Sequence, residues 1–152
     1  TVVATDLHFP NGSVITPDGS TLIVGETTGN RYTAFTIGPD GSLLARRPWA
    51  TFAPVPTAGS FAEQLGQLVV SPDGCSLDAE GHIWCGWGSN GRVPAEPLDG
   101  VRVFDAAGKA LGHIHLPERC ANLCFGGAKR NRLFMAASHS LYALYVNVQG
   151  AA

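Results

Sequence analysis

Short apolar stretches alternate along the chain with turns rich in glycine, proline and aspartate. In the first part of the sequence these stretches cover residues 13–16, 21–24, 31–37 and 42–52. Their lengths are typical of β-strands, and turns such as Pro17-Asp18-Gly19 favour hairpins because glycine accepts the positive φ that tight turns require. The pattern therefore predicts four consecutive antiparallel strands.

The same order of strands and turns recurs further along the chain. The second unit predicts strands at 75–77, 82–85, 101–105 and 110–116, and a weaker third unit predicts strands at 122–125 and 132–136. The spacing of roughly 50 to 60 residues lies at or above the upper end of the range for propeller repeats. Four antiparallel strands form one blade of a β-propeller. We therefore predict an all-β partial propeller domain over residues 1–152, with about three blades at 8–52, 70–117 and 120–148.

An inserted loop at residues 53–69 interrupts the repeat. Within it, residues 60–68 carry apolar side chains at helical spacing behind Ser60, which is a suitable N-cap. We expect a short helix here, on the face of the propeller that carries Asp73, where it would serve as a lid or as an oligomer contact.

The composition narrows the class of protein. Hydrophobic residues make up 45% and charged residues 14%, with 19 glycines and 10 prolines, which disfavours a helical bundle. The net charge is -2 and no cluster of lysine and arginine lies on a repeated face, so we expect no nucleic-acid partner. No run of 18 apolar residues occurs, so we expect no segment that spans a membrane.

The cysteines Cys75, Cys85, Cys120 and Cys124 lie in apolar, strand-like segments and fit no zinc motif well. We expect buried free thiols, with a disulfide or a metal site as alternatives. Free thiols favour a reducing compartment, and hence a cytoplasmic protein. The chain starts at Thr1 without an initiator methionine or a signal-peptide pattern, so we expect that an upstream segment was removed or cut away.

Two tripeptides place a metal-capable side chain between proline and glycine: Pro10-Asn11-Gly12 and Pro72-Asp73-Gly74. Each precedes the first strand of its unit. In a propeller these strands line the central axis, so Asn11 and Asp73 are predicted to converge at one mouth of the axis. Asx-Gly pairs also favour turns by themselves, and a purely structural role is the alternative interpretation.

Three further residues are candidates for contact with a substrate at this mouth. Glu26 and Trp87 lie in the segments 25–30 and 86–91, which we expect to be turns on the same face, and His8 precedes Asn11. Each has a plainer interpretation as well. Glu26 would be a solvated turn acid, Trp87 a packing residue and His8 a residue of the rim.

The combination of motifs resembles the family of senescence marker protein 30, gluconolactonase and luciferin-regenerating enzyme. The resemblance rests on Phe9-Pro10-Asn11-Gly12, 16–19, 24–27, 31–35, the long run 72–84 and Cys124-Phe125-Gly126-Gly127. It covers nearly the whole chain, and the run 72–84 is highly specific. The family consists of calcium-dependent β-propellers with six blades, so the resemblance implies that this chain corresponds to the C-terminal half.

The resemblance also implies an activity and a site. It implies that Asn11 and Asp73 are ligands of a divalent metal on the axis, with Ca²⁺ preferred and Zn²⁺, Mn²⁺ and Mg²⁺ as alternatives. It further implies that Asp73 transfers a proton during hydrolysis of a sugar lactone or a similar cyclic ester. A metal and a neighbouring carboxylate suffice for this chemistry, without a catalytic triad.

The chain also departs from the family. The family's first metal ligand, a glutamate, and the arginine and asparagine that contact substrate have no counterpart here. An N-terminal half on another chain or lost by proteolysis, a homodimer of two half-propellers, and a degraded relic are the three explanations. A non-catalytic metal-binding or interaction module is the alternative function, and a phosphotriesterase or another esterase is a third.

Overall fold

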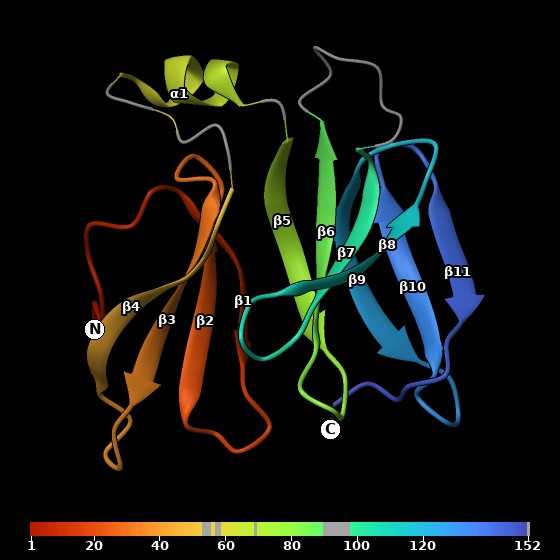
Figure 1. Ribbon diagram of the computed structural model, residues 1–152, viewed down its shortest axis with the longest axis horizontal. Helices are drawn as coiled ribbons and strands as arrows, with labels where there is room; N and C mark the ends of the chain where they lie inside the picture. The colour runs from red at the N-terminus through yellow and green to blue at the C-terminus, as the bar shows by residue number, and fades with distance from the viewer. Residues whose placement is uncertain (53–55, 57–58, 69, 90–97, 152) are drawn as a thin grey trace.

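The computed structural model describes residues 1–52, 56, 59–68, 70–89 and 98–151. Within this part the chain forms three antiparallel sheets, side by side (Figure 1). The first sheet has the order β1-β2-β3-β4. Its strands are β1 (Pro10–Ile15), β2 (Thr21–Glu26), β3 (Arg31–Ile37) and β4 (Leu43–Thr51).

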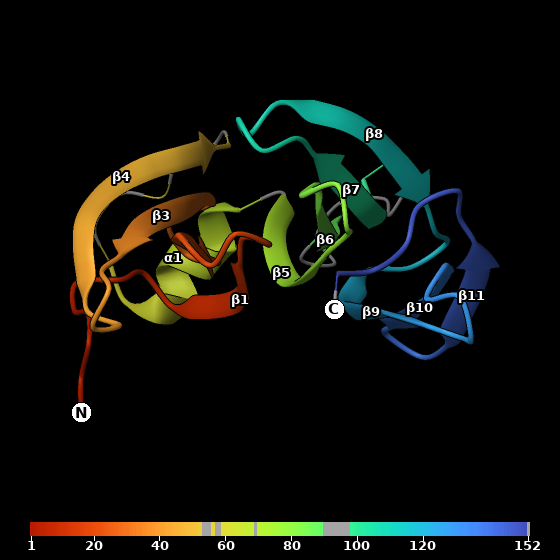
Figure 2. The same ribbon diagram turned by 90° about the horizontal axis from the view of Figure 1, so that it is seen from below.

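The second sheet repeats the first, and the third has three strands among the described residues. The second has the order β5-β6-β7-β8, with β5 (Val70–Leu77), β6 (Ile83–Ser89), β7 (Gly100–Phe104) and β8 (Ala110–His115). The third has the order β11-β10-β9, with β9 (Cys120–Gly126), β10 (Arg132–Ala137) and β11 (Leu141–Tyr145). Figure 2 shows the sheets fanned in an arc, with β1, β5 and β9 on its inner side. The prediction of about three antiparallel propeller blades is confirmed.

A short helix, α1 (Phe61–Gln67), lies over the end of the sheets at which β5 begins (Figure 1). We call this end of the molecule the α1 end. The Ser60 side chain accepts a hydrogen bond from the Glu63 N–H, and the Glu63 carboxylate accepts one from the Ser60 N–H. This capping box satisfies donors that the first helical turn leaves free, and it confirms Ser60 as the N-cap. None of the described helices is long and apolar enough to cross a membrane.

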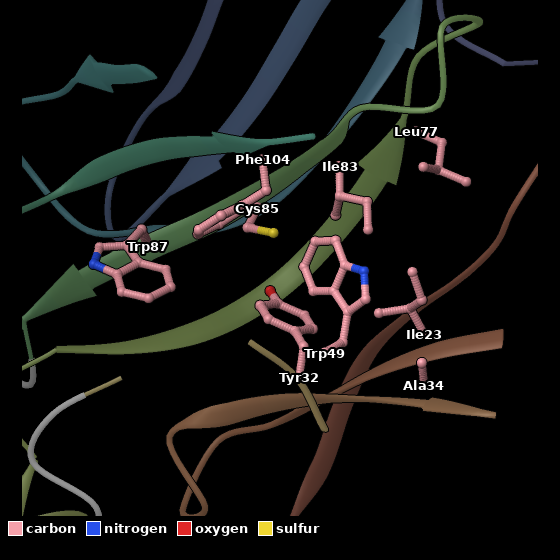
Figure 3. Packing of buried hydrophobic residues seen from close by; sticks show 9 residues of the cluster. All are labelled: Ile23, Tyr32, Ala34, Trp49, Leu77, Ile83, Cys85, Trp87 and Phe104. Atoms are coloured by element: carbon pink, nitrogen blue, oxygen red, sulfur yellow. The ribbon is translucent and has the colours of Figure 1, made fainter. Parts of the chain in front are cut away.

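Two apolar clusters hold the three sheets together. Between the first and second sheets, a cluster of nine buried side chains contains Tyr32, Trp49, Trp87 and Phe104 (Figure 3). Between the second and third sheets, Trp84 packs with Leu123, Leu133 and Met135 among others. Because each cluster draws side chains from two neighbouring sheets, no sheet packs as an independent unit.

Each inner strand contains a β-bulge close to its start. The register of β1 against β2 shifts between Pro10 and Ser13, and that of β5 against β6 shifts between Pro72 and Cys75. The register of β9 also shifts, where Ala136 and Ala137 of β10 pair with Asn122 and Cys120. A bulge inserts an unpaired residue and re-aims the side chains beside it. The two Pro-Asx-Gly elements are therefore bulges inside strands, and not turns before them.

Glycine at these bulges lets the inner strands touch. A Cβ on Gly12 would lie 2.5 Å from the Asp73 carbonyl oxygen, and a Cβ on Gly74 would lie 2.3 Å from Asn122 Oδ1. Real Cβ atoms do not approach other atoms this closely. The strands β1, β5 and β9 can therefore pack backbone to backbone only because these two positions carry no side chain.

Two strands extend further than the sequence predicted. β2 runs to Glu26 and β6 runs to Ser89, so Glu26 and Trp87 lie in strands and not in turns. The glycines in these segments serve close packing: a Cβ on Gly25 would lie 2.9 Å from the Tyr32 ring, and a Cβ on Gly86 would lie 2.7 Å from the Cys120 carbonyl oxygen. The expected turn residues 90–91 lie outside the described part of the chain.

Candidate functional site

Asn11 and Asp73 meet at the α1 end, where the bulges of β1 and β5 lie next to each other. Asn11 Nδ2 donates a hydrogen bond of 2.8 Å to Asp73 Oδ1. The same amide donates to Thr27 Oγ1 at 3.2 Å, and the Thr27 hydroxyl donates to the Pro72 carbonyl oxygen at 3.2 Å. Two residues 62 positions apart are thus brought into contact, in the way that the repeat pattern predicted.

Arg119 contacts the other oxygen of the Asp73 carboxylate. One guanidinium nitrogen, NH2, lies 3.0 Å from Asp73 Oδ2 and 3.2 Å from Ser71 Oγ, and NH1 lies 3.3 Å from the Ser89 carbonyl oxygen. The side chains of Asp73 and Arg119 are 20% and 23% exposed, so the pair is reachable from solvent but mostly covered. The sequence analysis missed Arg119, because it belongs to neither Pro-Asx-Gly element and lies 46 residues from Asp73.

Glu26 lies in a cationic environment near His8. Its side chain is fully buried, and it accepts two hydrogen bonds of 2.9 Å from Arg31, one of 2.7 Å from the His8 backbone N–H, and one from the Thr33 hydroxyl. Arg46 lies at 3.7 Å. The interpretation of Glu26 as a solvated turn acid is therefore wrong. The His8 residue is exposed and lies beside Gly29 at the same end of the sheets.

Glu26 gives the protein a specific dependence on pH. Burial opposes ionisation of this carboxyl, but the hydrogen bonds from Arg31, Thr33 and His8 outweigh it and hold its pKa below the ordinary value of 4.5. A carboxyl with a lowered folded pKa stabilises the fold above its unfolded pKa, and this contribution is lost as the pH falls through the folded pKa.

We therefore expect Glu26→Gln to lower the free energy of unfolding by about 1 to 3 kcal/mol at pH 7, because charge-assisted hydrogen bonds are lost. The difference from the unsubstituted chain should shrink as the pH falls below about 4.5. Urea unfolding at pH 7 and at pH 3 measures both values. Glu80→Gln, at a side chain that is 65% exposed, is the matched control and should change little. An equal loss at both pH values would contradict this role for the Glu26 charge.

Trp87 is directed into the core between the first two sheets (Figure 3). The residue is 1% exposed, and its ring packs on Phe52 at 4.7 Å and on Phe104 at 6.2 Å. The Arg102 guanidinium lies 5.1 Å from the Trp87 ring centroid. The other edge of the indole borders a cavity of about 340 Å³ between Arg102, His113 and His115. Trp87 is thus placed for packing between the first two sheets.

The side chains of Asn11 and Asp73 carry the oxygen donors that hard divalent cations prefer. They offer an amide and a carboxylate on adjacent strands, with the carboxylate partly exposed. Ca²⁺ takes about six to eight oxygen ligands, so these two residues would be part of a larger set. No group of three or more His, Cys, Asp or Glu residues that could hold a metal occurs within the described ranges. Asn122 of β9 lies against Gly74, and its side-chain oxygen accepts from the Leu123 N–H at 2.8 Å.

All four cysteines are free thiols, in agreement with the expectation from their setting. Burial raises the pKa of Cys75 to about 12 and that of Cys120 to about 11, so both are protonated at neutral pH. Burial also raises the pKa of the Cys85 thiol well above its ordinary value. Cys124 differs from the expectation because it is exposed, on the face of the third sheet that the second sheet does not cover.

The sequence pattern of the SMP-30/Gluconolactonase/LRE-like region matches residues 1–139. The chain belongs to this family. The shared region includes both bulge elements, Arg119, the first two sheets and strands β9 and β10 of the third, so the predicted resemblance is confirmed.

Named relatives of this family extend beyond the chain. A lactonohydrolase of Aspergillus oryzae is 26% identical over 175 residues, which cover 99% of this chain and 32% of that protein. The gluconolactonase structure from Xanthomonas campestris is 34% identical with a TM-score of 0.68, covering 93% of this chain and 39% of its own. The structure of regucalcin, a calcium-binding protein from Agrobacterium tumefaciens, shares the fold at 20% identity, with a TM-score of 0.71 and coverage of 99% and 50%. The chain thus spans about a third to a half of these relatives.

Proposed function

We propose that the chain is part of a metal-dependent hydrolase that opens a sugar lactone or a similar cyclic ester. The observation that carries the proposal is the contact of Asn11 with Asp73 across two bulged inner strands, at the end of the sheets where solvent reaches the partly covered carboxylate. The gluconolactonase and the lactonohydrolase among the relatives support the substrate class.

In this proposal Asp73 is both a metal ligand and the general base, and Asn11 is a second metal ligand. The regucalcin relative, which is described as calcium-binding, supports Ca²⁺ as the cation, with Mg²⁺, Mn²⁺ and Zn²⁺ as alternatives. When bound, such an ion polarises the lactone carbonyl and lowers the pKa of water. His8 at the rim and the ion pair of Glu26 with Arg31 would border the substrate.

In this proposal Asp73 carries the proton from water to the ring oxygen of the lactone. Asp73 Oδ1 takes a proton from water as the water oxygen bonds to the lactone carbonyl carbon. The bond from that carbon to the ring oxygen then breaks, and the proton passes to the ring oxygen, which leaves a hydroxy acid. Asn11 orients Oδ1 from one side, while Oδ2 remains bound to Arg119.

We further propose that a second half-propeller completes the site, either as a second copy or as the remaining half of the propeller. The first sheet and the N-terminal segment, with Val3 and Leu7, line an apolar cavity of about 220 Å³ that includes Leu22, Val24 and Phe35. The third sheet presents one of about 150 Å³ that includes Phe134 and Leu141. Both lie on faces that the second sheet does not cover, and apolar faces of this kind pack against further blades in a closed propeller.

The four free thiols support a reducing compartment for this enzyme. A cytoplasmic location is therefore part of the proposal. Fractionation of the source cells, followed by immunodetection of the chain, measures it directly.

The activity is tested by hydrolysis of glucono-δ-lactone in a weakly buffered solution with a pH indicator. We expect hydrolysis with Ca²⁺, its loss with EDTA, and its return when Ca²⁺ is added in excess. Light scattering on the same sample should give at least twice the mass of one chain. Failure to hydrolyse any lactone of a panel would overturn the proposed activity and favour a non-catalytic module. Hydrolysis that EDTA leaves unchanged would overturn the metal dependence.

A further inference from the structure

Arg119 reaches the candidate site from the far side of the second sheet. It lies between β8 and β9, and its side chain crosses β6 at Gly88, where a Cβ would lie 2.5 Å from Arg119 Cγ and 2.7 Å from Arg119 Cβ. No side chain larger than hydrogen fits at position 88 while Arg119 keeps this course. The glycine therefore provides the path by which the arginine stem reaches Asp73.

Two buried serines bind the Arg119 guanidinium. Ser71 and Ser89 are 1% and 6% exposed, and they offer Arg119 a hydroxyl oxygen and a backbone carbonyl oxygen. The Ser89 N–H in turn donates to Asp99 Oδ1 at 2.6 Å, and Asp99 is 3% exposed. Since these two acceptors, one from β5 and one from β6, bind different nitrogens of one planar group, they fix the orientation of the guanidinium before any ligand binds.

The Asp73 carboxylate is consequently held from both sides. Asn11 donates to Oδ1 from β1, and Arg119 donates to Oδ2 from the position just before β9. Rotation of the carboxylate about its Cβ–Cγ bond would break both hydrogen bonds. Arg119 thus keeps Oδ2 bound away from the site and leaves Oδ1 facing Asn11.

We propose that Arg119 is a positioning residue for Asp73: it occupies Oδ2 so that only Oδ1 is presented to water and to a cation beside Asn11. The inference rests on the proposed function for its catalytic consequence, but the orientation of Asp73 can be measured without any activity. Asp73 would accordingly act through Oδ1 alone, with one lone pair toward Asn11 and the other toward the cation or the attacking water.

The test compares Arg119→Met, which keeps the stem over Gly88, with Arg119→Lys, which keeps the charge but loses the fork of donors. Arg47→Met, at an exposed position of β4, is the matched control. We expect the Asn11 side-chain NH₂ resonance in a ¹⁵N-resolved NMR spectrum to move in Arg119→Met, because Asp73 is then free to rotate. It should move less in Arg119→Lys, and not at all in Arg47→Met.

In the lactone assay we expect Arg119→Met to lower kcat by about 10- to 100-fold, the usual effect of removing a residue that hydrogen-bonds a metal ligand. KM should change by less than about 3-fold, and Arg119→Lys should recover part of kcat. An Asn11 resonance that does not shift in Arg119→Met would overturn the proposal. A loss of kcat in Arg119→Met would also overturn it if a lower unfolding midpoint explains the loss and Arg119→Lys does not recover kcat. If the unsubstituted chain hydrolyses no lactone, the proposed function fails, and the Asn11 resonance alone still decides the role of Arg119.

Discussion

Replacement of Asp73 by asparagine is expected to lower kcat for lactone hydrolysis by about 10²- to 10⁴-fold. The substitution keeps the size of the side chain but removes the charge and the group that accepts a proton from water. Asparagine has a single acceptor oxygen, so it keeps the hydrogen bond from either Asn11 or Arg119 and loses the other. Urea unfolding of the same variant therefore separates a loss of stability from the loss in the chemical step and in cation affinity. Initial rates over a range of lactone and Ca²⁺ concentrations separate kcat, KM and the cation requirement.

Asp40→Asn is the matched control for this substitution. Asp40 is an exposed turn residue whose carboxylate accepts hydrogen bonds from Ser42. Its replacement should leave kcat within about 2-fold, since it removes the same charge far from the candidate site. Retention of more than a third of kcat by Asp73→Asn would contradict the assignment of Asp73 as the general base.

Trp87→Ala is expected to lower the free energy of unfolding by about 3 to 5 kcal/mol, the usual range for removal of a large buried aromatic side chain. Trp87 is 1% exposed and packs on Phe52 and Phe104 in the cluster that joins the first two sheets. The Arg102 guanidinium would also lose the ring beside it. Urea unfolding followed by circular dichroism measures the change.

Two variants sharpen this test. Trp87→Phe keeps an aromatic ring and should recover part of the loss, and Leu111→Ala, at a residue that is 52% exposed, should cost less than about 0.5 kcal/mol. A Trp87→Ala chain of unchanged stability with a raised KM for lactone would show instead that the indole contacts substrate. That result would reverse the assignment of Trp87 to packing.

The strands and the helix were predictable because their signals are local. Short apolar runs, Asp-Gly turns and the Ser60 N-cap act over a few residues, and the structure places strands and α1 close to where these patterns occur. The approach of Asn11 to Asp73 was predictable as well, since a repeat places equivalent residues at equivalent points around the axis.

Glycine accounts for the errors in strand ends. Gly25 and Gly86 looked like turn residues, whereas each makes room for a neighbour: the Tyr32 ring for one, and the Cys120 carbonyl for the other. A single sequence does not separate a glycine that needs positive φ from one that needs space. Glu26 and Trp87 were consequently assigned to turns at the mouth of the propeller, although both are buried in strands.

Arg119 illustrates a different limit of sequence reasoning. Its partners Ser71, Asp73 and Ser89 come from two strands of the preceding sheet, and no spacing in the chain connects them. Arginine between a proline-containing loop and an apolar strand is common on protein surfaces. Only the course of its side chain over Gly88 distinguishes it from such a residue.

The backbone contact of the inner strands at Gly12 and Gly74 restricts how this site can be redesigned. Since a methyl group at either position would collide with the adjacent strand, positions 12 and 74 are closed to substitution, and new chemistry must be introduced at the residue before each glycine. Exchanges at positions 11 and 73 alone, such as Asn11→Asp or Asp73→Glu, would alter the charge and reach of the ligands while the strands keep their spacing. A library confined to these two positions would therefore sample different metals and reactions on an unchanged frame.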